Sequence, residues 1–134
     1  MAFAVATLGG ALAQDAIAHR QANFKRMGEI MQALRPVAQS QGDPRPFMND
    51  LRFIHDWSMG IPNAFPAGSD QGATKARPAI WSDRATFDSR ASDFAAQVPK
   101  LLAAAEAGDG AVFAREYAAT GQTCSACHRS FRAR

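Results

Sequence analysis

Hydrophobic residues recur along this chain at alternating steps of three and four positions, with polar residues between them. This spacing predicts amphipathic α-helices, because residues three and four apart share one face of a helix. The first helix is expected over residues 15–39, with Pro36 kinking or ending it. Arg20 falls on its inner face, among the apolar positions Ile17, Phe24, Met27, Met31 and Leu34.

A second helix is predicted from Asp43 and Pro44 to about residue 59, because an Asp cap followed by proline is a common helix start. Its inner positions are Phe47, Leu51, Ile54 and Ser58. Pro78 opens a third helix, bent late by Pro99. Its inner positions are Ile80, Phe87, Phe94 and Leu101, with Ala91 and Val98 beside them.

Gly108 and Asp109 are expected to end the third helix and to cap a fourth. The inner positions of the fourth helix are Phe113, Tyr117, Thr120, Cys124, Cys127 and Phe131. The stretch 60–77 is rich in Pro and Gly and is the one long connection, so it is expected to pack over something. The fold class is therefore all-α, an up-down-up-down four-helix bundle.

The composition fits one domain, because 134 residues can enclose a single sizeable core. The formal net charge is +3, without a dense Lys/Arg run. So mild an excess is typical of a solvated surface, or of one that attracts an acidic redox partner, and nucleic-acid binding is not expected. No stretch is long enough to span a bilayer, so no membrane partner is expected either.

Residues 1–13 are uncharged, small and apolar, and end in Ala-Leu-Ala. This predicts the remnant of a secretory signal peptide, with residues 14–134 as the mature domain, although the usual basic start is missing. The alternative is a short buried helix end, against which Gly9 and Gly10 argue. Export predicts a periplasmic protein.

The candidate chemistry lies near the C-terminus, in the sequence Cys124-Ser125-Ala126-Cys127-His128. Cys-x-x-Cys-His is the attachment motif of c-type haem. The two thiols share one side of a helix and can reach two vinyl groups, while the imidazole of His128 is close enough to bind the iron. The motif predicts one covalent haem c inside the bundle, with His128 as the metal ligand.

Other interpretations of this motif are a zinc site and a redox dithiol. Zinc would need a distant fourth ligand, His19 or His55. A dithiol would sit beside a βαβ pattern, which the sequence lacks. Arg20 is equally open: it either extends to solvent near the helix start or meets a haem propionate, since a buried charge needs a partner.

Together these motifs resemble the class II cytochromes c, and more narrowly the cytochromes c′. The resemblance covers nearly all of residues 14–134. Besides the haem motif and its tail His-Arg-Ser-Phe-Arg at 128–132, it rests on Phe-Pro-Ala-Gly at 65–68 and on Arg20-Gln21 with Phe24. It also rests on Lys-Ala-Arg-Pro-Ala-Ile-Trp-Ser-Asp at 75–83 and on Ala-Glu-Ala-Gly-Asp at 105–109.

The resemblance implies that His128 is the proximal iron ligand, that Arg20 holds a propionate, and that Arg132 lies in the proximal pocket, where nitric oxide can replace the histidine. Relatives with methionine at the position of Phe24 are six-coordinate, low-spin electron carriers. A phenyl ring has no lone pair, so Phe24 implies five-coordinate, high-spin iron. Ligation by Met27 on the same face is the alternative, and it would give a low-spin electron-transfer cytochrome.

These features predict a protein that binds nitric oxide and carbon monoxide, with electron transfer as an additional role. An enzyme is not expected, because neither His19 nor His55 falls on the inner face as a distal acid–base group. The resemblance also implies a homodimer. The redox partner is not indicated by the sequence.

Overall fold

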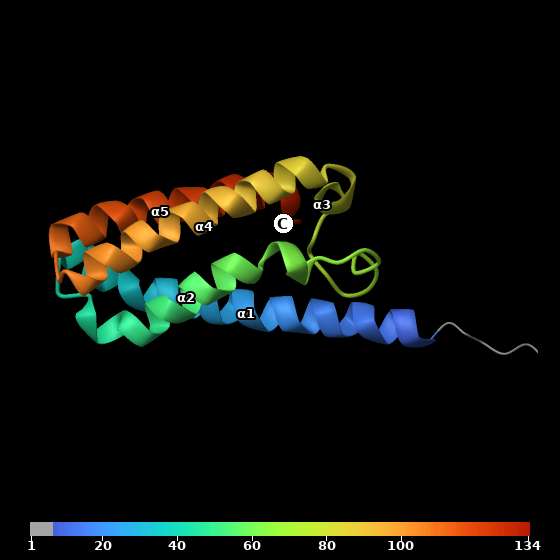
Figure 1. Ribbon diagram of the computed structural model, residues 1–134, viewed down its shortest axis with the longest axis horizontal. Coiled ribbons are helices and arrows are strands. Elements are labelled where there is room, and N and C mark those ends of the chain that lie inside the picture. The colour runs from blue at the N-terminus through green and yellow to red at the C-terminus, as the bar shows by residue number, and fades with distance from the viewer. Residues whose placement is uncertain (1–6) are drawn as a thin grey trace, which may run out of the picture.

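The computed structural model describes residues 7–134 and is an antiparallel bundle of four long helices (Figure 1). They are α1 (Thr7–Ser40), α2 (Met48–Gly60), α4 (Arg84–Glu106) and α5 (Gly110–Phe131). A short helix, α3 (Ala79–Ser82), precedes α4, and single 3₁₀ turns cover Arg45–Phe47 and Pro62–Ala64. No strand occurs within residues 7–134. The prediction of an all-α, up-down-up-down bundle is confirmed.

The core contains the inner positions that the three-and-four spacing predicted. Leu34, Leu101 and Phe113 are completely buried, and Phe87 and Phe94 nearly so. These rows meet because α4 contacts both α2 and α5, and α1 contacts α5. Burial of such side chains stabilises the fold by about 1.5–3 kcal/mol each.

The end of the first helix agrees with the prediction to within one residue, whereas the third helix differs from it. Helix α1 continues through Pro36 to Ser40, where the Ser40 hydroxyl donates to the Pro36 carbonyl at 2.9 Å. The chain then turns at Gln41, whose φ is +52°. The third helix is divided at Asp83 into α3 and α4.

One of the three predicted helix caps, Asp43, is wrong. The Asp43 carboxylate accepts a hydrogen bond from the Arg45 amide at 3.0 Å, but α2 begins only at Met48, and neither α2 nor the 3₁₀ turn Arg45–Phe47 has a side-chain cap. The other two predicted caps are present. Gly108 adopts a φ of +65°, the left-handed conformation that favours glycine after a helix. Asp109 caps α5 by accepting from the Val112 amide at 3.1 Å.

The predicted signal remnant, residues 1–13, lies partly outside the described residues. Residues 7–13 belong to α1, so the expectation that Gly9 and Gly10 keep this stretch out of a helix is wrong. A helix of more than thirty residues tolerates two glycines, because each costs only about 1 kcal/mol. Leu12 is exposed, so this helix end is not buried. The export signal itself stays a prediction.

Candidate functional site

The haem motif lies in the last turns of α5. Cys124 and Cys127 are half-buried, face the hydrophobic core, and are free thiols. His128, one position further, lies at the surface, and its imidazole is partly buried. The end of the helix is fixed by Phe131, which is 4% exposed and packs edge-to-face on Phe87 at 5.4 Å between ring centroids.

The protonation of the motif follows from its burial. Burial raises the pKa of Cys124 and, helped by the neighbouring Cys124, that of Cys127. Partial burial of the imidazole, and then the charge of Arg132, lowers the pKa of His128. Reactive dithiols need a lowered thiol pKa, so these cysteines lack that property. A neutral imidazole, in contrast, keeps the lone pair that a metal ligand needs.

The zinc interpretation lacks ligands. Among residues 7–134, no three His, Cys, Asp or Glu side chains converge in a group that could hold a metal ion. His19 instead packs edge-on against Trp57, at 5.7 Å between ring centroids. His55 contacts Asp56 at 3.4 Å. Neither histidine completes a four-ligand site with the motif at the end of α5.

Arg20, on α1, is buried and binds the long connection. It is 2% exposed, so the interpretation that it extends to solvent is wrong. Its guanidinium donates to the Ser69 hydroxyl at 2.8 Å and the Ser69 carbonyl at 2.7 Å, with longer bonds to the Ala64 carbonyl and the Thr74 hydroxyl. It also stacks over the ring of Phe65 at 4.5 Å. The connection 60–77 therefore packs over α1, as expected from its length.

The neutral partners of Arg20 do not balance its charge. No ion pair within the described part of the chain includes Arg20, and burial lowers its pKa. A buried guanidinium is stabilised by an anion that it can reach. This environment fits a haem propionate, the role that the family resemblance implied for Arg20.

An aromatic cluster adjoins Arg20. Phe24 packs edge-to-face on Trp57 at 5.1 Å between ring centroids and lies 6.3 Å from Phe65. Met27, one turn further along α1, is 8% exposed and belongs to the core. Trp57, on α2, was not among the residues selected from the sequence. Its position three residues after Ile54 was the available signal.

Trp57 carries an unsatisfied donor. Its Nε1 is buried and has no hydrogen-bond partner among the described residues. A buried donor without an acceptor costs about 1–3 kcal/mol, so such a group indicates an acceptor that completes the site. A propionate carboxylate has the chemistry to accept this hydrogen bond.

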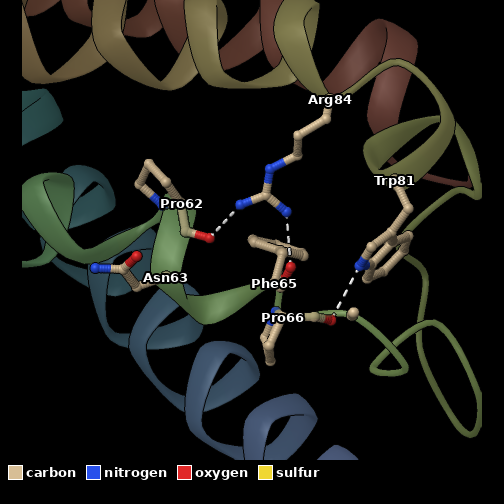
Figure 2. A pocket seen from close by; sticks show the side chains of 7 residues that line it. Pro62, Asn63, Phe65, Pro66, Trp81 and Arg84 are labelled. Atoms are coloured by element: carbon tan, nitrogen blue, oxygen red, sulfur yellow. Dashed lines mark hydrogen bonds between the residues drawn. The ribbon is translucent and has the colours of Figure 1, made fainter.

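The connection is held from the other side by α3 and α4, as Figure 2 shows. The Trp81 Nε1 donates to the Pro66 carbonyl at 3.0 Å. Arg84 donates to the Phe65 carbonyl at 2.7 Å and to the Pro62 carbonyl at 2.5 Å. These side chains line an open cleft of about 390 Å³ and fix Phe65 against Phe24. Sequence reasoning did not identify Arg84, because its partners in the connection are backbone carbonyls and its other partner, the Asp88 carboxylate at 3.0 Å, is a neighbour on the same helix.

The residues present fit a covalent haem. Two thiols and a neutral imidazole stand on one helix, so the thiols could form thioether bonds to the vinyl groups of haem and the imidazole could bind the iron. The unpaired Trp57 N–H and the buried Arg20 guanidinium provide donors for carboxylates. These features agree with one another although they come from three helices.

The sequence model of one family, described as Cytochrome C', matches residues 15–132. The chain belongs to the cytochrome c′ family. Members of this family are haem c-type cytochromes that bind gases, and Cys124, Cys127 and His128 form the matching attachment motif. The resemblance to the cytochromes c′ that the sequence motifs indicated is thus confirmed.

Relatives from two organisms illustrate the match. The cytochrome c' of Rubrivivax gelatinosus is 35% identical over 88% of this chain and 94% of its own length. A crystal structure of that organism's cytochrome c' has a TM-score of 0.83 and covers 90% of this chain and 96% of its own, at 34% identity. A nitric oxide complex of a variant cytochrome c prime from Alcaligenes xylosoxidans has a TM-score of 0.82 and 31% identity, covering 91% and 97%.

Arg132, the remaining residue that the resemblance implied, follows the last turn of α5. Its amide donates to the His128 carbonyl at 3.2 Å, and its backbone pairs with Ala76 in an isolated antiparallel bridge. Its side chain is exposed. Arg132 thus lies one helical turn beyond His128, and its charge acts on the imidazole.

No helix in residues 7–134 combines the length and the apolar character needed to cross a bilayer.

Proposed function

We propose that this protein is a periplasmic cytochrome c′ with five-coordinate, high-spin iron, which binds nitric oxide and, more weakly, carbon monoxide. Haem c, once attached to Cys124 and Cys127, supplies the iron centre for the gas. His128 would hold the iron through an imidazole nitrogen. The observation that carries the proposal is the phenyl ring of Phe24, held against Trp57 in the apolar cluster.

Phe24 decides the coordination in this proposal. The ring has no lone pair, so it can cover the sixth position but cannot bind there. Its edge-to-face contacts with Trp57 and Phe65 hold it in place, so an entering gas must displace it. Nitric oxide binds iron strongly enough to meet that steric cost. The nitric oxide complex of the Alcaligenes xylosoxidans protein supports this choice of ligand.

The proposed role is the capture or buffering of nitric oxide, and no catalytic activity is proposed. An enzyme would need an acid–base residue beside the open coordination site. His19, the histidine closest in sequence to Phe24, is exposed, and its Nδ1 lies 3.4 Å from the amide nitrogen of Asn23. Its ring packs on Trp57 at 5.7 Å between centroids, and no ring contact joins it to Phe24 among the described residues.

The second candidate function is electron transfer by a low-spin cytochrome with a Met27 ligand. Met27 favours it because the residue is buried on the same face of α1 as Phe24. The opposing argument is that Met27 packs within the hydrophobic core, where methionine commonly fills space.

An absorption spectrum of the purified haem protein separates the two functions. High-spin spectra in both oxidation states support gas binding at an open site. Sharp low-spin bands that disappear in Met27→Leu would instead establish the electron carrier. Export is tested by fractionating cells and locating the haem, and the proposed homodimer by sedimentation at micromolar concentration.

A further inference from the structure

Two segments that are distant in sequence meet at the end of α5. The bridge between Ala76 and Arg132 joins residues 75–77 to residues 131–133. The Ala133 amide donates to the Lys75 carbonyl at 2.7 Å, and the Arg77 amide donates to the Phe131 carbonyl at 3.0 Å. Figure 1 shows this end of the chain beside α3. The bridge places the side chains of both segments on one part of the surface.

These segments concentrate positive charge. Together with the flanking residues 129, 130 and 134, they form a basic surface. Its five basic residues are Lys75, Arg77, Arg129, Arg132 and Arg134. Neither 75–77 nor 128–134 contains Asp or Glu. All but Arg77 are exposed, and Arg77 is partly so. No ion pair found within residues 7–134 includes any of the five.

The rest of the chain has the opposite balance. The sequence has 15 Lys and Arg against 12 Asp and Glu, so the ten basic residues outside this surface are outnumbered by the acidic ones. The basic surface thus holds more than the whole net charge of +3. A charge distribution polarised in this way orients an approaching charged partner.

The basic surface also adjoins the haem motif. Arg129 directly follows His128, and the Arg77 guanidinium donates to the Arg129 carbonyl at 3.4 Å. A protein seated here would lie against the turn that bears the haem attachment site. Electron transfer falls steeply with distance, so this is the place where a redox partner gains most from docking.

We propose that the basic surface docks an acidic electron-transfer protein. This inference rests on haem being attached to α5, and it is independent of the coordination of the iron and of gas binding. The reaction is the passage of one electron from the reduced partner to ferric haem, with no bond made or broken. Such encounters have small interfaces and rely on charge complementarity, so they weaken as salt rises.

An anionic membrane is a less suitable occupant. Peripheral membrane binding needs apolar side chains beside the basic ones. The exposed large hydrophobic residues of the described chain are Leu12 and Met59, and both lie outside the two segments. A protein with acidic side chains needs no apolar contribution from the basic surface.

The test uses the haem-loaded protein and a reduced plant-type [2Fe–2S] ferredoxin, an acidic redox protein, as the probe. The variant Lys75→Glu with Arg134→Glu reverses two exposed charges and leaves the haem motif intact. Its control is Arg35→Glu with Lys100→Glu, which makes the same change in net charge. Arg35 lies in the last turns of α1 and Lys100 in the second half of α4, towards the opposite end of the bundle (Figure 1).

We expect the first pair of substitutions to raise the Kd for ferredoxin at low ionic strength by about tenfold or more, and to slow haem reduction in parallel. The control pair should change both by less than about threefold. Reduction by a small neutral reductant should be the same in all three proteins, which separates docking from a change in the haem. Equal weakening by both pairs would overturn the proposal, because net charge alone would then explain binding.

Two further results would also overturn it. One is ferredoxin binding that does not depend on salt. The other concerns vesicles of equal parts phosphatidylglycerol and phosphatidylcholine. The proposal fails if the Lys75→Glu and Arg134→Glu pair abolishes binding to these vesicles and leaves ferredoxin binding unaffected. An absorption spectrum recorded beforehand must show that the protein with Lys75→Glu and Arg134→Glu keeps its haem. Since gas binding enters none of these measurements, a failure here leaves the proposed gas-binding function standing.

Discussion

The indole of Trp57 stands edge-on to the phenyl ring of Phe24, with ring centroids 5.1 Å apart and ring planes at 86°. The two residues come from α2 and α1, so the contact joins two helices at the side chain that we propose covers the iron. Edge-to-face aromatic pairs contribute about 0.5–1.5 kcal/mol beyond the area that they bury. Phe24 is therefore restrained and does not turn freely.

Replacing Phe24 by alanine should speed carbon monoxide binding to the reduced protein by about tenfold or more, since removing roughly 1.4 kcal/mol from a barrier has that effect. Stopped-flow or flash-photolysis measurements would give the rate. Leu12→Ala is the matched control, because this exposed residue of α1 is remote from the aromatic cluster in sequence. An unchanged rate in Phe24→Ala would show that Phe24 does not restrict access to the iron.

Replacing Trp57 by phenylalanine removes the unpaired Nε1 and keeps an aromatic ring against Phe24. If that N–H donates to a haem propionate, its loss leaves the carboxylate charge less compensated. The midpoint potential should then fall, by on the order of tens of millivolts. Trp81→Phe is the control, because the Trp81 N–H already has a partner in the Pro66 carbonyl. A potential that stays at the wild-type value in Trp57→Phe would contradict this assignment.

Replacing Arg20 by methionine should lower the free energy of unfolding by about 3–5 kcal/mol, because it leaves buried acceptors at Ser69 and Ala64 without their donor. Chemical denaturation of the haem protein would measure this. Arg26→Met is the matched control on the same helix. The exposed Arg26 lies over Phe53 at 3.9 Å and should cost less than about 1 kcal/mol. Equal losses in both variants would show that the hydrogen bonds of Arg20 to the connection stabilise the fold no more than an exposed contact does.

Two glycine-to-alanine substitutions should have opposite signs. Gly28 lies within α1 with open space around the position of a Cβ, so Gly28→Ala should stabilise the protein by about 0.5–1 kcal/mol. At Gly110, the first residue of α5, a Cβ would overlap the backbone of Gln41 and Gly42. Gly110→Ala should therefore destabilise it by more than about 2 kcal/mol. Thermal unfolding would rank the two variants, and a stabilised Gly110→Ala would contradict the close approach of α5 to the turn after α1.

The candidate site could be predicted from the sequence where its chemistry is local. Cys124, Cys127 and His128 are contiguous, so their spacing alone indicated the cofactor and the ligand. Arg20 was left undecided, because its environment is made by residues 44 or more positions away. Trp57 was passed over because burial of its N–H depends on how α1 and α2 pack. Arg84 gave no signal at all, since it binds backbone carbonyls of Pro62 and Phe65.

By itself, the sequence determined the number and order of the long helices, their inner faces and the haem motif. These depend on periodicity and on short spacings, which act over one or two helical turns. Only the tertiary structure decided where α1 begins, that Arg20 is enclosed by the connection 60–77, and that Lys75 and Arg77 meet the end of α5. Those outcomes depend on contacts between residues far apart in the chain, and no local pattern specifies which distant partner a side chain will meet.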